Sequence, residues 1–330
     1  MIDGRRQGGP ILVLALLVLA ITTLVLPPGA EGQKHDREGH VPVRAVPGPP
    51  GSLPGPGVTA AVASPSEPDR VYGATHSGLF VSVDRGATWH RLTVDGDREE
   101  VFGLAVHPTD SGVVYLGRRD GLWQVRDQGR GRTQLALPIS ELYIPLSIAV
   151  APSQPDVIYV ATARQGIFRS DDGGASWTAG SHGLPKARAG GRPEEIHTLV
   201  VDPRNAGTAY IADQRSGVYR TTDGGTSWDP FNRGLPSFAL RGVYPPRLAF
   251  DPGDPPRLYL LVLERVHSHL LRNRLYVAGA AGTWLPVEAE LPAGTRILGM
   301  SIDRGTRALR LWAENGIWEV LLPGDSGAGR

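Results

Sequence analysis

The chain has 330 residues and a mass of 35.2 kDa, and its 41% hydrophobic content is enough to bury a core, which excludes wholesale disorder. A formal net charge of +1 at pH 7 excludes a strongly basic nucleic-acid-binding protein. The absence of cysteine excludes disulfides, thiolate metal sites and cysteine nucleophiles.

The first thirty residues have the pattern of an export signal. Arg5 and Arg6 precede an unbroken apolar run over residues 11–26. As a helix this run spans roughly 24 Å, which is short of the ~30 Å hydrocarbon core of a bilayer. Residues 1–30 are therefore predicted to be a signal peptide, with an uncleaved N-terminal membrane anchor as the alternative. Both interpretations place the rest of the chain in the periplasm or outside the cell, touching the membrane only if residues 11–26 are retained.

Residues 31–57 form a linker rich in proline and glycine, which disfavours a helix. Within it, residues 41–46 alternate valine with other residues, as a short strand does. We expect this strand to pair with the last repeat described below and to close the fold, because a closed ring leaves no open sheet edge.

Residues 58–323 consist of a repeated pattern, followed by a flexible tail at 324–330. Each copy has an alternating apolar strand, a polar loop, a strand with a central tyrosine, a tight glycine turn and a third strand. The spacing is about 43 to 52 residues, which is the length of one propeller blade of four short strands. The six visible copies lie near 58–94, 101–137, 145–180, 196–231, 245–288 and 297–323.

This periodicity predicts an all-β fold: a six-bladed β-propeller of four-stranded antiparallel blades, preceded by an N-terminal hydrophobic helix. A seven-bladed propeller is the alternative. The last copy supplies only three strands before the tail, and the strand at 41–46 is the expected fourth.

Three copies share the pattern Ser/Thr-x-Asp-x-Gly-x-Ser/Thr-Trp between their third and fourth strands. The aspartate can accept backbone N–H bonds across the turn, the glycine can supply a positive φ, and the tryptophan can pack over the result. These residues are therefore expected to be structural. They are Ser82, Asp84, Gly86, Trp89, Ser170, Asp172, Gly174, Trp177, Thr221, Asp223, Gly225 and Trp228.

The motif resembles the Asp-box, or bacterial neuraminidase repeat. Among Asp-box propellers, the chain is most similar to the photosystem II stability and assembly factors and to the sortilin-type propeller. The Gly-Leu-Pro segments that begin at Gly183 and Gly234 are typical of both groups. The resemblance implies that the box is a structural staple away from the active face. It also implies an arginine-rich surface that is presented to a partner polypeptide.

The opposite face is expected to carry the hairpins between second and third strands and the connections between blades. Arginines recur there, and their planar forks suit carboxylate, sulfate or phosphate groups. The predicted partner-binding residues are Arg118, Arg119, Arg164, Arg215, Arg188, Arg192 and Arg241.

From these observations we expect a non-catalytic binding, scaffold or assembly module whose partner is a protein, including one associated with a membrane, or a glycan. The alternative is a glycoside hydrolase of the sialidase or xyloglucanase type. The predicted face offers acids and a tyrosine for such chemistry, but the arginine segment with which sialidases begin is absent from the first blade. The candidate groups are Asp120, Glu141, Tyr143, Glu194 and Glu264.

No cofactor, no metal site and no catalytic residue are assigned from the sequence. His267 and His269 could bind a metal, but they lack a third ligand nearby. A phosphate-binding loop, a nucleophile elbow and a zinc signature are also missing.

Overall fold

The computed structural model describes residues 43–47, 58–92, 100–126, 129–139, 144–184, 196–213, 215–236, 245–251, 253–265, 271–279, 281–291, 295–303 and 308–322. All of them belong to one compact unit, His40–Arg330. The apolar run at 11–26 and the tail at 324–330 lie outside the described residues. In the part of the chain that is described, no helix has the length and apolar character needed to cross a membrane.

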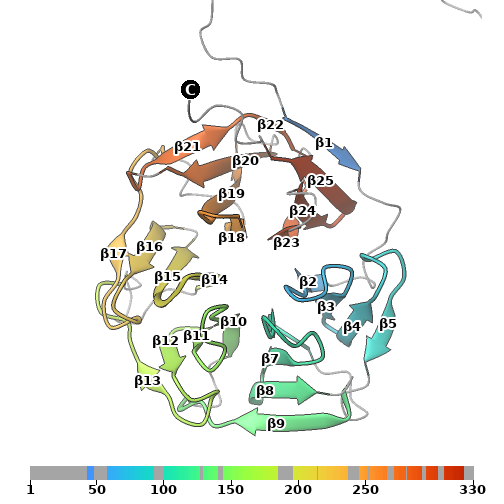
Figure 1. The fold of residues 1–330 in the computed structure, drawn as a ribbon, viewed down its shortest axis with the longest axis vertical. Coiled ribbons are helices and arrows are strands. Elements are labelled where there is room, and N and C mark those ends of the chain that lie inside the picture. The colour runs from blue at the N-terminus through green and yellow to red at the C-terminus, as the bar shows by residue number, and fades with distance from the viewer. Residues whose placement is uncertain are drawn as a thin grey trace, which may run out of the picture. The chain divides into compact units, whose positions relative to one another are not determined.

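The described residues form six sheets arranged as the blades of a propeller (Figure 1). The prediction of an all-β, six-bladed propeller of four-stranded antiparallel blades is thus confirmed, and the seven-bladed alternative is wrong. Glycines with positive φ begin the third strand in five blades, as at Gly78 with a φ of 129°, because a tight hairpin needs a backbone that other residues rarely adopt.

Each blade runs from an inner strand to an outer strand. The first three blades contain β2 (Val58–Ala63), β3 (Val71–Thr75), β4 (Gly78–Ser82) and β5 (His90–Leu92); β6 (Gly103–Val106), β7 (Val114–Arg118), β8 (Gly121–Arg126) and β9 (Gly131–Leu135); and β10 (Pro145–Val150), β11 (Ile158–Thr162), β12 (Gly166–Ser170) and β13 (Thr178–Ala179). The next two contain β14 (Thr198–Asp202), β15 (Asn205–Asp213), β16 (Gly217–Thr221) and β17 (Asp229–Pro230); and β18 (Arg247–Asp251), β19 (Arg257–Arg265), β20 (Leu271–Ala278) and β21 (Trp284–Val287).

The sixth blade is assembled from both ends of the described chain. Its own strands are β23 (Ile297–Ile302), β24 (Ala308–Ala313) and β25 (Gly316–Leu321). β1 (Val43–Pro47) pairs antiparallel with β25, with Val46 opposite Glu319. A short strand that the sequence did not predict, β22 (Ala289–Glu290), pairs parallel with β1, so that this sheet has five strands.

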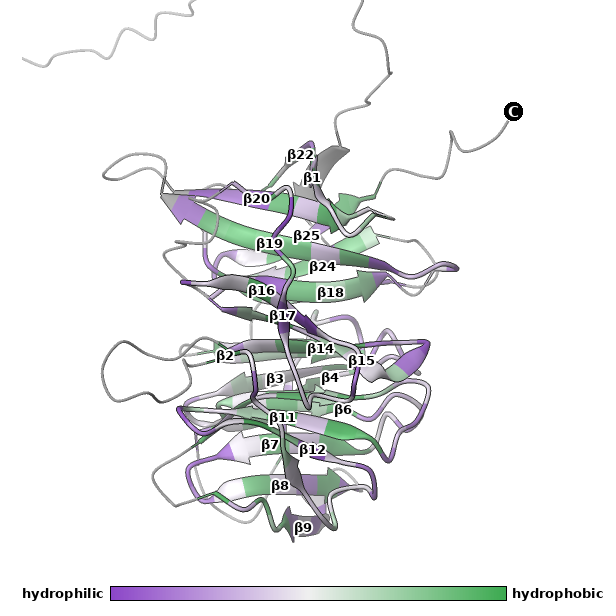
Figure 2. Ribbon diagram, turned by 90° about the vertical axis from the view of Figure 1, so that its left-hand side faces the viewer, coloured by the Kyte–Doolittle hydropathy of each residue, from purple (hydrophilic) through white to green (hydrophobic). Residues whose placement is uncertain are grey.

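The apolar core is divided among the junctions between neighbouring blades. Each of six clusters of buried side chains draws its members from two adjacent blades. The cluster between the last and first blades contains Trp312, Val71 and Ala61. Figure 2 shows hydrophobic residues along the strands and hydrophilic residues toward many strand ends and loops, which are therefore the parts available for binding.

Polar contacts also join successive blades. The Tyr72 hydroxyl donates to the Ser111 carbonyl of the second blade at 2.6 Å, and the Tyr159 hydroxyl donates to Ala206 of the fourth blade at 2.7 Å. The tyrosine repeated in the second strands thus links two of the blade pairs, because a buried phenol needs a hydrogen-bond partner.

At two blade junctions, the segment after an outer strand covers the tryptophan of the next blade. The Trp228 amide donates to the His182 carbonyl at 2.9 Å, and its indole Nε1 donates to Gly180 at 3.2 Å. Trp284 repeats this pattern one blade later, with its amide donating to Arg233 at 2.8 Å and its Nε1 donating to Phe231 at 2.7 Å.

Candidate functional site

The two faces of the ring carry different loops. On one face, Arg85, in the turn after the third strand, pairs with Asp69, in the loop after the inner strand. We call this the turn face. On the other, Glu100, in a blade connection, pairs with His76 and Arg119, which lie in hairpins between second and third strands. We call this the hairpin face.

The turn face is built by self-contained hydrogen bonds. In the fourth blade, Asp223 Oδ1 accepts from the Ser227 amide at 2.9 Å and Oδ2 accepts from its hydroxyl at 2.6 Å, while the Thr221 hydroxyl donates to Oδ1 at 2.8 Å. The same bonds occur around Asp84 and Asp172.

These hydrogen bonds stabilise the ionised carboxylate. They lower the pKa of Asp223 to about 2, with the Ser227 hydroxyl and amide contributing most and Thr221 next. The pKa values of Asp84 and Asp172 are likewise lowered to about 2 by bonds from neighbouring hydroxyls and amides. The oxygens of these carboxylates thus accept hydrogen bonds from within their own turn, which agrees with the structural role expected for them.

Four of the seven predicted arginines lie in described residues. Arg119, Arg164 and Arg215 are exposed on the hairpin face. Arg118 is only 5% exposed, which removes most of its surface from any partner. The other three, Arg188, Arg192 and Arg241, lie outside the described residues.

A cluster of charged and aromatic side chains occupies the hairpin face where the first and second blades meet. Glu100 pairs with His76 and with Arg119, whose Nη2 lies 3.1 Å from Glu100 Oε2. The Arg119 guanidinium stacks over the Phe102 ring, 5.0 Å from its centroid. Phe102 is partly exposed, so a ring and a carboxylate are presented together.

Trp123 lies in the same junction, and two guanidinium groups contact its ring. Arg118 and Arg132 lie 5.5 and 5.2 Å from its ring centroid, and its indole Nε1 donates to Asp120 Oδ1 at 3.0 Å. These contacts fix the orientation of the indole, which stays partly exposed. We define Glu100, Phe102, Asp120 and Trp123 as the first-junction cluster.

The sixth blade repeats one element of this cluster. Trp318 donates from Nε1 to Asn315 Oδ1 at 3.0 Å, with the same three-residue spacing as Trp123 and Asp120. The amide of Asn315 cannot serve as an acid, so the group that orients this indole is not a carboxylate.

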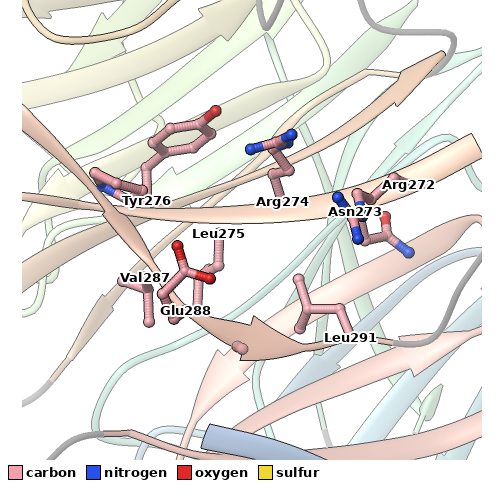
Figure 3. A pocket seen from close by; sticks show the side chains of 10 residues that line it. Arg272, Asn273, Arg274, Leu275, Tyr276, Val287, Glu288 and Leu291 are labelled. Atoms are coloured by element: carbon pink, nitrogen blue, oxygen red, sulfur yellow. The ribbon is translucent and has the colours of Figure 1, made fainter. Parts of the chain in front are cut away.

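A cavity of about 460 Å³ opens at the outer part of the fifth blade. The pairing of β20 with β21 begins only at Leu275, so the part of β20 before Leu275 extends beyond β21 there. Figure 3 shows Arg274 and Tyr276 on one side of β20 and Leu275 on the other, with Glu288 nearby.

Glu264 is 5% exposed and pairs with Arg274. It is therefore less accessible than the sequence led us to expect.

The remaining predicted acids and the tyrosine of the hydrolase alternative, Glu141, Tyr143 and Glu194, lie outside the described residues, as do His267 and His269. Among the described residues, His, Asp and Glu side chains form no group of three suited to a metal ion.

The sequence analysis missed Glu100, Phe102 and Trp123. Glu100 and Phe102 alternate with buried residues just before β6, and Trp123 does so near the start of β8. This alternation was the available signal, but its use requires knowing which side of each strand faces the neighbouring blade.

The fold is that of a β-propeller, and no model of a known protein family matches the chain. An oligoxyloglucan-reducing end-specific xyloglucanase from Emericella nidulans is 29% identical over 181 residues, which cover 52% of this chain and 17% of that enzyme. A xyloglucanase from a Paenibacillus species is 30% identical over 164 residues, covering 37% of this chain and 16% of that enzyme. The chain thus matches about a sixth of the length of these relatives.

Solved structures give the same fold. An ancestral GH74 enzyme aligns with a TM-score of 0.59 and 22% identity over 88% of this chain and 39% of its own. The GH74 xyloglucanase of Xanthomonas campestris aligns with a TM-score of 0.55 and 20% identity over 85% of this chain and 47% of its own. YCF48 from Cyanidioschyzon merolae also aligns, at a TM-score of 0.48 and 12% identity, which is too low to support an argument.

The xyloglucanase relatives contradict our preference for a non-catalytic scaffold or assembly module and favour the glycoside hydrolase alternative. The error has a physical source. We counted the missing sialidase arginines against catalysis, but those arginines bind the carboxylate of an acidic sugar. A neutral polysaccharide has no such group, so their absence is not evidence against an enzyme for it.

Proposed function

We propose that the chain is a glycoside-hydrolase propeller for a β-glucan of the xyloglucan type, and that the first-junction cluster is its sugar-binding and acid–base site. The similarity to xyloglucanases, at 29% identity over 52% of the chain, is the observation that carries this proposal. Since a polysaccharide is too large to enter a cell, such an activity agrees with the export predicted from the N-terminus.

The composition of the cluster supports this choice of site. A neutral sugar offers an apolar ring face and several hydroxyls, which suit a partly exposed indole and carboxylates. Trp123 supplies the ring, and its position is fixed by contacts with the Arg118 and Arg132 guanidinium groups and by the hydrogen bond to Asp120. Because the indole is already ordered, stacking a sugar on it costs little side-chain entropy.

Glycoside hydrolysis requires two carboxyl groups, one to protonate the leaving oxygen and one to act as a nucleophile or to activate water. Glu100 and Asp120 are the carboxyl groups of the cluster. Both are paired with arginine, since Arg119 lies 3.1 Å from Glu100 and Arg118 Nε lies 3.3 Å from Asp120 Oδ1. The paired arginines hold each carboxylate in place at the junction.

The test incubates the purified full-length chain with xyloglucan and with an unbranched β-1,4-glucan, and measures new reducing ends. Glu100→Gln and Asp120→Asn should each lower turnover of xyloglucan by about 10²-fold or more. Asp171→Asn is the matched control, because Asp171 is an exposed carboxylate paired with an arginine on the turn face. No turnover by the unaltered chain would contradict the proposal.

Binding is measured separately by calorimetry with xyloglucan oligosaccharides. Trp123→Ala should weaken binding, since stacking on the indole is lost. Trp318→Ala removes the corresponding indole in the sixth blade and should leave binding unchanged. Equal losses in the two variants would show that the first junction is not the site.

A further inference from the structure

Glu100 is fixed in place by both of the blades that meet at the first junction. Next to it in the blade connection, the Val101 carbonyl accepts from the Thr59 hydroxyl of the first blade at 2.6 Å. The Phe102 amide donates to the Gly117 carbonyl of the second blade at 2.8 Å. The backbone beside Glu100 is therefore held from two directions, which positions its carboxylate before any ligand arrives.

The carboxylate itself is also held from both blades. Its Oε1 pairs with Nδ1 of His76, one of the two residues in the turn between β3 and β4, and its Oε2 pairs with Arg119 of the second blade. The His76 side chain is 61% exposed, whereas that of Glu100 is only 23% exposed. The imidazole thus reaches from a carboxylate inside the junction to the solvent, with Nε2 on the edge of the ring away from Nδ1.

The two carboxyl groups of the first-junction cluster have partners of different chemistry. Asp120 contacts Arg118 Nε at 3.3 Å and Trp123 Nε1 at 3.0 Å. Neither a guanidinium nor an indole gives up its proton in a protein, whereas an imidazole gains and loses protons readily near neutral pH. Of the two carboxyl groups, it is therefore Glu100 whose partner, His76, is able to supply a proton.

A glycosidase that activates water directly leaves its acid without a proton and its base with an extra one at the end of each cycle. The acid then has to be protonated again. We propose, on the basis of the proposed function, that Glu100 is the acid, that Asp120 is the base, and that His76 is a positioning residue that returns a proton from solvent to Glu100.

The protons balance over one cycle. Glu100 protonates the leaving oxygen as the glycosidic bond breaks, and Asp120 takes a proton from the water that attacks the sugar. His76 then passes its Nδ1 proton to Glu100 Oε1 while Nε2 takes a proton from solvent. Asp120 releases its proton to solvent, so the net reaction is the addition of one water molecule across the bond.

The first test compares His76→Ala and His76→Asn with the unaltered full-length chain on xyloglucan. Both should lower kcat by at least about tenfold and leave KM within about twofold, because the loss lies in proton transfer and not in binding. The asparagine keeps a hydrogen-bond donor for Glu100 but cannot pass on a proton. His90→Ala is the matched control, since His90 is an exposed histidine of β5 in the same blade, and should keep full turnover. Full turnover by His76→Asn would show that a hydrogen bond is enough and would overturn the proposal.

The second test replaces the missing proton carrier or removes the need for it. Added imidazole should raise kcat of His76→Ala toward that of the unaltered chain, because position 76 is open to solvent. A dinitrophenyl glycoside leaves without protonation, so His76→Ala and Glu100→Gln should turn it over nearly as fast as the unaltered chain, whereas Asp120→Asn should not. Absence of imidazole rescue, or an equal loss in all three variants on this substrate, would contradict the assignment.

The outcomes separate this inference from the proposed function on which it rests. If the unaltered chain releases no reducing ends from xyloglucan, both fail. If it turns over xyloglucan and His76→Ala does so equally well, the role of His76 fails and the proposed function stands. Thermal unfolding of each variant, with His90→Ala for comparison, checks that a lower kcat does not come from loss of the fold.

Discussion

Replacing Gly299 by alanine tests whether close backbone contact holds the last blade against the first. Gly299 lies in β23, and a Cβ atom at this position would lie 2.1 Å from the Ala61 carbonyl oxygen of β2. Ordinary contact begins near 3.4 Å, so the two inner strands would have to separate by about 1.3 Å. Because the obstacle is backbone, no side-chain rotation can relieve the overlap.

Overpacking of this kind typically costs about 1–3 kcal/mol, and we expect the upper part of that range because both strands are held in sheets. A loss of about 2 kcal/mol should lower the melting temperature by roughly 4–8 °C. Gly112→Ala is the matched control, since its Cβ would meet only the Asp110 side chain, at 3.3 Å. Urea and thermal unfolding measure both variants, and equal stabilities would refute the argument from backbone contact.

Three other changes test the described fold. Trp228→Ala should cost about 3–5 kcal/mol in urea unfolding, because the ring is 1% exposed, and more than the same change at the partly exposed Trp177. The turn-face carboxylates, with pKa values lowered to about 2, stabilise the fold fully above pH ~4, and this stabilisation should be lost as the pH falls toward 2. Changing all three to asparagine should flatten that part of the stability profile, and a curve with the original slope would contradict this origin. Deleting residues 38–50 removes β1 and exposes the edge of β25, so the melting temperature should drop, whereas an unchanged value would mean that β1 does not secure the sixth blade.

The number of blades was predictable because each blade repeats local signals. Alternating strands, a hairpin glycine such as Gly78 and a tryptophan turn recur along the chain at the length of one blade, and these features depend only on neighbours in the sequence. β22 escaped prediction because its partner is β1, which lies more than two hundred residues away in the chain. A strand of two residues is too short to show a periodicity that would reveal such a pairing.

The site was less predictable because it depends on which side of each strand faces a neighbour. Arg118 and Arg119 are adjacent in sequence, yet Arg118 turns into the junction and stacks on Trp123 while Arg119 remains exposed. The sequence identified both as surface arginines.

The cover that the segments after β13 and β17 provide for Trp228 and Trp284 determines how blades can be exchanged between propellers. The amide and the indole of Trp228 are both satisfied by residues of the preceding blade, at His182 and Gly180. A chimera cut at sheet boundaries would leave these donors facing a foreign segment. The unit to graft is therefore offset from the visible blade. It begins at one covering segment and ends just before the next, so that Trp228 or Trp284 is transferred together with its own acceptors.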